Sequence, residues 1–206
     1  MGVVRIIAGS LRRRKIQVPP GGKVRPTGDR VREALFDILG PSVEGARVLD
    51  AFAGSGALGL EAASRGARSV TFLERDRRVL AVLQRNVMDL GVESRCHLVP
   101  GRIETPFRTR IPGAPFDLVL ADPPYDDPVR VRFLRDLSAS TVLAEFARVV
   151  VERDRRSAAA EEGLGSLVLE RCARYGRTCL DFYRWKGAEP RRSGPPGDTA
   201  PESKAG

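Results

Sequence analysis

Two kinds of hydrophobic pattern alternate along the chain and predict a repeated strand–helix order. Short runs of consecutive apolar residues recur, and between them apolar residues return every three or four positions. The first pattern is typical of strands buried on both faces, and the second of amphipathic helices. The expected strands are 47–51, 69–74, 96–100, 116–122 and 148–152, and the expected helices are 58–65, 76–90 and 129–147, with a break near Ser140 and Thr141.

Glycines at positions 66 and 91 follow the first two of these helices, where we expect them to end the helices. This strand–helix order predicts an α/β fold, namely a doubly wound, mostly parallel sheet. Residues 167–176 and 178–185 predict a closing antiparallel pair of strands.

The N-terminal residues predict an extension to this sheet. Residues 3–9 and 15–19 have the pattern of two short strands, and the basic turn 10–14 joins them. A helix is expected from Asp29 to Leu39, with Thr27 as its N-cap. We therefore expect three parts: an N-terminal hairpin and helix over 1–40, a main domain over 41–186, and a tail over 187–206.

Two segments have weak patterns. The tail contains four prolines and no apolar periodicity, so we expect it to be disordered. Residues 153–165 are rich in charged and small side chains, and we expect a mobile loop there.

The charge of the chain favours a nucleic-acid partner. The 206 residues carry a formal net charge of +9, and only four of the 35 basic residues are lysine. The arginine guanidinium binds two phosphate oxygens at once and stacks on bases, although a GC-rich coding bias would also enrich arginine.

Other features exclude several classes of protein. No apolar run reaches the length of a membrane helix, and the N-terminus lacks the order of a secretory signal. We therefore expect a cytoplasmic protein with no membrane partner, and a monomer. Three cysteines at unrelated spacings and a single histidine, His97, indicate neither a disulfide framework nor a metal site.

A glycine-rich turn follows the strand at 47–51. Gly54, Gly56 and Gly59 have the spacing of a dinucleotide-binding turn, and Glu74 ends the next strand 20 residues after Gly54. A carboxylate at that position can bond the ribose hydroxyls of an adenosine. Both features fit NAD and S-adenosylmethionine equally well.

Asp50 favours S-adenosylmethionine, because it precedes the turn at the end of the strand. An acid there can attract the ammonium and sulfonium groups of S-adenosylmethionine, whereas it would repel the pyrophosphate of NAD. The small residues around it allow the backbone to approach the methionine part closely.

A second motif, "ADPPY" at 121–125, follows the strand at 116–122 and indicates transfer to an amino group. Asp122 and the carbonyl of Pro123 can each accept one hydrogen of an exocyclic amine, and the ring of Tyr125 can stack on the base. Orientation and desolvation then suffice for attack on a sulfonium methyl. No cysteine follows a proline in this loop, so methylation at a pyrimidine ring carbon is not indicated.

These motifs resemble class I S-adenosylmethionine-dependent methyltransferases. "RIIAGSLRRRKIQVP" followed by "RPTGDRVREALFDIL", and "RYGRTCLDFYRW" near the end, resemble the RsmD-type family of bacterial 16S rRNA guanine-N2 methyltransferases over residues 4–186. The resemblance implies a seven-stranded sheet with an N-terminal hairpin. It also implies methyl transfer to N2 of one guanine in 16S rRNA, within the small ribosomal subunit or its assembly intermediate, with S-adenosylhomocysteine as the product.

The resemblance also implies roles for individual residues. Gly101 and Arg102 stand where the family often has an acid near the adenine, so backbone groups at Arg102 and Ile103 are expected to bind the adenine instead. The residues expected at the cofactor are Asp50, Ala53, Gly54, Ser55, Gly56, Glu74, Arg75, Arg102, Ile103 and Asp122. The residues expected to act in catalysis are Asp122, Pro123 and Tyr125.

RNA contacts are expected in the N-terminal extension. The basic residues of the hairpin can grip RNA phosphates, namely Arg5, Arg12, Arg13, Arg14 and Lys15. The resemblance implies that Arg25, Thr27 and Arg32 lie near the substrate entrance and also contact the RNA. Three other functions stay open: a DNA adenine-N6 methyltransferase, an NAD-dependent oxidoreductase, and a non-catalytic RNA-binding assembly factor.

Overall fold

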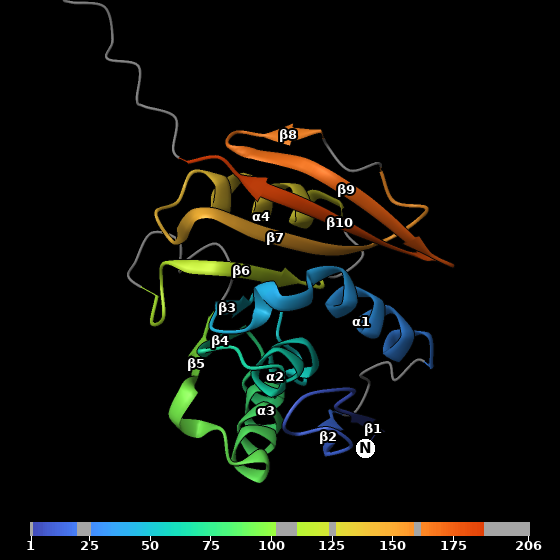
Figure 1. The fold of residues 1–206 in the computed structure, drawn as a ribbon, viewed down its shortest axis with the longest axis vertical. Helices are drawn as coiled ribbons and strands as arrows, with labels where there is room; N and C mark the ends of the chain where they lie inside the picture. Colours follow the sequence, from blue (N-terminus) through green and yellow to red (C-terminus); the bar gives the residue numbers. More distant parts are fainter. Residues whose placement is uncertain (1, 20–25, 102–110, 124–126, 159–161, 188–206) are drawn as a thin grey trace, which may run out of the picture.

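A single twisted sheet organises the computed structural model, which describes residues 2–19, 26–101, 111–123, 127–158 and 162–187, with the backbone alone at 26, 27 and 127 (Figure 1). Its strands follow the order β5-β4-β3-β6-β7-β10-β9-β8. Their bounds are β3 Arg47–Asp50, β4 Ser69–Glu74, β5 Cys96–Pro100, β6 Phe116–Ala121, β7 Leu143–Asp154, β8 Gly163–Leu164, β9 Leu167–Tyr175 and β10 Thr178–Trp185.

Strands β3 to β7 run parallel to their neighbours, and β10 and β9 are antiparallel. The doubly wound, mostly parallel sheet is therefore confirmed, with eight strands in place of the seven expected. The additional strand, β8, is short and pairs only with Leu167 and Val168 of β9. Within the described chain, residues 170–175 of β9 consequently have a strand partner on one side alone.

Helices cover both faces of the sheet, which explains why the strands are apolar throughout. The helices are α1 Pro26–Leu39, α2 Ala57–Ser64, α3 Arg77–Leu90 and α4 Asp127–Ser138, with short 3-10 turns η1 Gly40–Val43 and η2 Glu93–Arg95. Residues of α1, α2 and α3 share one buried core with the sheet, and residues of α4 share the other. No helix among the described residues has the length and apolarity needed to cross a membrane.

Local chemistry explains where the helices end. The Asp76 side chain accepts a hydrogen bond from the Arg78 amide and caps α3, and Gly91 ends that helix with a φ of 69°. Gly66 follows α2 with a φ of 95°, as the sequence predicted. Thr27 is not an N-cap, because α1 already begins at Pro26. Proline suits a first helical position, where its missing N–H costs nothing.

The structure differs from two expectations for the stretch after α4. Residues 143–147 are the beginning of β7 and not helix, because Leu143 and Ala147 are buried in the α4-side core. Phe146 interrupts the regular pairing with a φ of 60° and is exposed. The expected mobile loop over 153–165 is also partly regular, since β7 continues to Asp154 and β8 occupies Gly163–Leu164.

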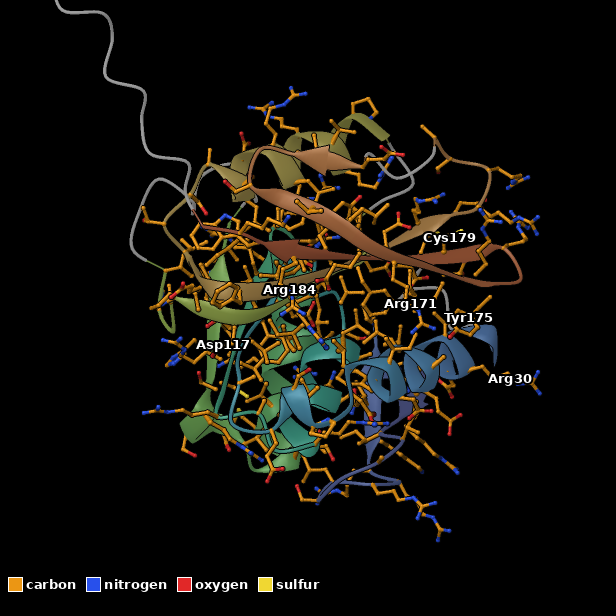
Figure 2. The ribbon with its side chains drawn as sticks, turned by 45° about the horizontal axis from the view of Figure 1, so that its top comes forward. Arg30, Asp117, Arg171, Tyr175, Cys179 and Arg184 are labelled. Carbon is orange, nitrogen blue, oxygen red and sulfur yellow. The ribbon has the colours of Figure 1, made fainter. Side chains whose placement is uncertain are left out.

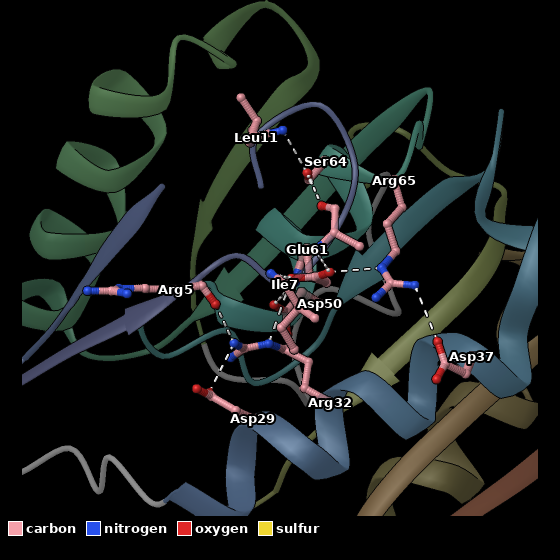
Figure 3. Close-up of polar contacts among 12 residues, drawn as sticks. Arg5, Ile7, Leu11, Asp29, Arg32, Asp37, Asp50, Glu61, Ser64 and Arg65 are labelled. Atoms are coloured by element: carbon pink, nitrogen blue, oxygen red, sulfur yellow. Dashed lines mark hydrogen bonds and ion pairs between the residues drawn. The ribbon is translucent and has the colours of Figure 1, made fainter. Parts of the chain in front are cut away.

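The N-terminal hairpin forms its own two-stranded sheet, from β1 Gly2–Arg5 and β2 Lys15–Val18. Its attachment to the domain depends on Glu61 of α2, which is fully buried (Figure 3). One carboxylate oxygen accepts the Ile7 amide at 2.8 Å and the other accepts the Ala8 amide at 3.0 Å. Ser64, one turn later, accepts the Leu11 amide and donates to the Ala8 carbonyl.

Two arginines complete the contacts of Glu61. Arg65 donates to it at 2.8 Å, and Arg32 of α1 lies 3.9 Å from its other oxygen. Arg32 also donates to the carbonyl of Arg5 at 2.6 Å and is only 6 % exposed. The expectation that Arg32 contacts RNA is therefore corrected: its guanidinium joins α1 to the hairpin, inside the protein.

The hairpin turn lies at the C-terminal ends of helices. It contacts Ser64 at the end of α2, and Arg14 donates to the carbonyl of Asp89 near the end of α3. Helices that connect parallel strands run opposite to those strands, so their C-terminal ends lie at the amino edge of the sheet. Arg12 and Arg13 are exposed at that end, whereas ligands of such sheets bind at the carboxyl edge.

We predict that Glu61→Ala weakens the fold strongly. The substitution leaves two amides without their acceptor and Arg32 without its buried countercharge, so the free energy of unfolding should fall by about 3–5 kcal/mol. Urea denaturation measures the loss. The matched control is Glu33→Ala on the exposed face of α1, which should change it by less than about 0.5 kcal/mol. Equal effects of the two substitutions would contradict the role assigned to Glu61.

Candidate active site

Three carboxylates meet at the carboxyl edge of the parallel strands. Asp50 ends β3, Glu74 ends β4, and Asp122 follows β6. These strands are neighbours in the sheet, so their ends lie side by side. The charges of Asp122 and Glu74 both act on Asp50, which confirms that the three groups are close.

Asp50 is buried, and only one of its two carboxylate oxygens has a hydrogen-bond partner among the described residues. One oxygen accepts the Gly59 amide at 2.9 Å, whereas Oδ1 has no hydrogen-bond partner among the described residues. Burial is the main cause that raises the pKa of Asp50 to about 7; the neighbouring charges of Asp122 and Glu74 add to it, and the Gly59 hydrogen bond opposes it. A buried carboxylate oxygen without a donor is suited to a cationic or hydrogen-bonding ligand.

The three glycines of the turn serve different purposes. Gly54 has a φ of 53°, and a side chain there would meet nothing closer than 4.0 Å, so its surroundings are open. A Cβ on Gly56 would lie 2.3 Å from a methyl of Leu83, and one on Gly59 would lie 2.3 Å from the ring of Phe72. Gly56 and Gly59 therefore allow α2 to pack against its neighbours, and Gly54 shapes the open side of the turn.

Glu74 holds the turn in place. Its carboxylate accepts the Gly54 amide at 2.9 Å through one oxygen and the Asp76 amide at 2.8 Å through the other. Each oxygen retains a second lone pair, and the side chain is half-buried, so a ribose hydroxyl can still donate to it. Arg75, next in sequence, is exposed.

The second motif is described up to its first proline. Asp122 is exposed and Pro123 is buried. Tyr125 of this motif, Arg102 and Ile103 of the expected adenine site, and Arg25 lie outside the described residues, as does the side chain of Thr27. Their expected roles stay predictions.

Two further residues fix the turn, and neither was singled out from the sequence. Asn86 of α3 donates to the carbonyls of Ser55 and Gln17 and accepts the Gln17 amide, all at 2.9 Å. It thereby joins the turn, α3 and β2. Phe52 contacts Phe133 of α4 edge to face, with ring centroids 5.4 Å apart. The signal for Asn86 was its place on the apolar stripe of α3, where a polar residue needs partners.

A buried ion pair occupies the same edge on the α4 side. Arg153 of β7 donates to Asp181 of β10 at 2.6 Å, and its guanidinium also reaches the sulfur of Cys172 at 3.7 Å. Arg153 lies two residues beyond Val151, which pairs with Ala121 at the end of β6. The pair therefore stands near the strand that carries Asp122.

We predict that Asp50 gives the apo protein a pH-dependent stability. Because the pKa of Asp50 is raised in the folded protein, its favourable contribution to the free energy of unfolding is complete below pH 4. That contribution is lost as the pH rises through 7. Asp50→Asn keeps the acceptor for Gly59 and abolishes the titration. Between pH 5 and pH 8, wild type should lose about 2–3 kcal/mol of unfolding free energy relative to this variant. Urea denaturation across that range measures it, and parallel curves would contradict the assignment.

Comparisons with known proteins agree with this geometry. The family described as Conserved hypothetical protein 95 matches residues 4–184. A putative rRNA methyltransferase of Bacillus subtilis, YlbH, is 33% identical over 187 residues, which cover 89% of this chain and 100% of that protein. Ribosomal RNA small subunit methyltransferase D of Haemophilus influenzae is 40% identical over 155 residues, covering 75% of this chain and 80% of that protein.

A solved structure shares the fold as well. The putative methyltransferase yhhF from Escherichia coli superposes with a TM-score of 0.78 at 34% identity, over 91% of this chain and all of that chain. The family match over residues 4–184 spans the glycine turn, the closing strands and most of the hairpin. The chain therefore belongs to the Conserved hypothetical protein 95 family, the RsmD-type ribosomal RNA methyltransferases.

Proposed function

We propose that this chain transfers a methyl group from S-adenosylmethionine to the exocyclic N2 of a guanine in small-subunit rRNA. The observation that carries the proposal is the place of Asp122 and Pro123, at the carboxyl end of β6 beside Asp50 and the glycine turn. The printed names of the relatives supply the substrate class, since several are called ribosomal RNA small subunit methyltransferase D.

The residues of the turn fit the cofactor. Asp50 offers a buried carboxylate oxygen that needs a donor, which an ammonium group supplies. The open side of Gly54 leaves room for the methionine part, and Glu74 stands where ribose hydroxyls can donate. When bound, S-adenosylmethionine supplies a methyl group that is already electrophilic.

The chain's own contribution is orientation of the target amine. The Asp122 carboxylate would accept one amino hydrogen and the Pro123 carbonyl the other, so the nitrogen lone pair points toward the cofactor side. As the new C–N bond forms, the nitrogen becomes cationic and sheds a proton, which the adjacent Asp122 can accept. Pro123 is buried; its ring fixes φ, and the proline that follows it in the sequence restricts ψ, so the direction of the Pro123 carbonyl is limited.

A methyl-transfer assay tests the proposal. Labelled S-adenosylmethionine is offered with small ribosomal subunits, naked rRNA and duplex DNA, and the modified nucleoside is identified. N2-methylguanosine in rRNA is the expected product. N6-methyladenosine in DNA would show that the motif serves adenine, and binding of RNA without transfer to any substrate would favour an assembly factor.

We predict that Asp122→Ala abolishes transfer and leaves cofactor binding within about tenfold. Asp122 is exposed and is assigned to the amine, so its loss should lower kcat by at least a hundredfold. Single-turnover kinetics and calorimetric titration with S-adenosylmethionine measure the two effects. Asp136→Ala on α4 is the matched control and should change neither. A loss of cofactor affinity of 100-fold or more would place Asp122 at the cofactor instead.

For the hairpin, we predict that Arg12→Gln/Arg13→Gln raises the KM for rRNA and lowers the salt dependence of binding. Arg14 is left intact, because it contacts the Asp89 carbonyl. If both side chains reach phosphates, the slope of log K against log salt should fall by about 1.4 in magnitude. An unchanged slope would show that RNA does not extend to this end of the domain.

A further inference from the structure

The hairpin turn, which carries Arg12, Arg13 and Arg14 of the expected RNA contacts, and the candidate active site lie at opposite ends of the sheet. The hairpin turn sits on the C-terminal ends of α2 and α3, while Asp50, Glu74 and Asp122 lie at the carboxyl edge. A nucleic acid that delivers a base to Asp122 must pass over the carboxyl edge. Cations at that edge are therefore better placed than the hairpin turn to hold the nucleotides next to the target.

Such cations converge from two elements. β9 runs parallel to β7, since each is antiparallel to β10, so β9 ends at the carboxyl edge. Near its end it carries Arg171 and Tyr175, whose side chains share the α1 face of the sheet with Ala173, whereas Arg174 points to the opposite face. Figure 2 shows Arg171 and Tyr175 beside the first turns of α1, where Arg30 projects into solvent. Figure 1 shows the same end of β9 above the start of α1.

Arg30 and Arg171 have no carboxylate partner in the described part of the chain. Both are exposed, and the described residues offer neither of them a carboxylate within ion-pair distance. Arg177 in the following turn differs, because Asp154 lies 3.5 Å from it. A charge without a protein partner keeps its full attraction for a phosphate, whereas a paired one has to exchange partners first.

Tyr175 adds an aromatic surface to the group. Its ring is half-buried, because it packs against the core cluster that contains Val31 and Leu35 of α1. That packing fixes the ring, and the residue stays partly exposed beside Arg171 and the first turns of α1 (Figure 2). Fixed aromatic rings among cations are the usual platform for unpaired bases, and stacking contributes roughly 1–3 kcal/mol per base.

The spacing of the strands sets the distance to the candidate site. In the strand order, β9 is three positions from β6, which carries Asp122. At about 4.8 Å per strand, the separation is roughly 14 Å, a span of a few nucleotides. An RNA strand whose target base lies at Asp122 could therefore contact the end of β9 with its neighbouring nucleotides.

From these observations we infer that Arg30 and Arg171, with Tyr175, form a single-stranded RNA contact surface at the carboxyl edge. We call it the β9–α1 surface. It holds the nucleotides that flank the target, and the hairpin turn is a separate, more distant contact. The inference rests on the proposed function for the direction of the RNA, but its binding of RNA can be measured without turnover.

The experiment compares two double variants of the full chain. Arg30→Gln/Arg171→Gln removes the charges of the β9–α1 surface. Arg68→Gln/Arg85→Gln removes the same charge from exposed positions away from it. Fluorescence anisotropy with naked small-subunit rRNA fragments gives the affinity at several salt concentrations, and calorimetry with S-adenosylmethionine checks the cofactor site.

The surface variant should bind RNA at least about tenfold more weakly, with a salt slope smaller by about 1.4, as expected for two lost phosphate contacts on a single strand. The control should change affinity less than about threefold. Tyr175→Leu, which keeps the packing, should weaken binding without changing the slope. An unchanged slope in the surface variant overturns the inference, even if wild type methylates rRNA. A reduced slope supports it, even if wild type transfers no methyl group and the proposed function fails.

Discussion

The carboxylate of Glu61 is the interaction on which the arrangement of the whole N-terminal region depends. It collects two backbone amides of the hairpin and two guanidinium groups, in a place with no access to water. A carboxylate in such a position is tolerated when it is hydrogen-bonded and paired with opposite charges. Because α2 begins in the glycine turn, the same contact also fixes the hairpin relative to the candidate cofactor site.

The glycine turn is held by contacts from three directions, and this leaves little freedom at the point where a cofactor would bind. Glu74 bonds its backbone from β4, Asn86 bonds it from α3, and Phe133 contacts Phe52 from the opposite face of the sheet. Asp50 alone among these polar groups keeps an unused oxygen. A preorganised turn with one unsatisfied acceptor is suited to capture a cation without rearrangement.

Local patterns predicted most of the sheet, and distant contacts account for what they missed. Strand and helix periods are properties of neighbouring residues, so the elements around the glycine turn could be placed from the sequence. The hydrogen bonds of Glu61 to Ile7 and of Asn86 to Gln17 join residues 54 and 69 positions apart, which no local pattern reveals. For the same reason, Arg32 was expected to contact RNA. The sequence shows the charge of Arg32, but it does not show that the buried Glu61 lies beside it. Residues 143–147 have a helical period, and burial in the α4-side core made them a strand.

Residues 170–175 of β9 have a strand partner on one side only within the described chain, and this open edge affects how copies of the molecule can associate. An open strand edge invites a strand of another molecule to add to the sheet, and charged side chains on it oppose such growth. Arg171 and Arg174 lie on that edge strand, so their charges oppose edge-to-edge pairing between copies, in addition to any ligand that they bind. Glutamates at both positions would guard it equally well but would repel a phosphate backbone. A charge of either sign at these positions therefore opposes aggregation, but only a positive charge can also bind a phosphate backbone.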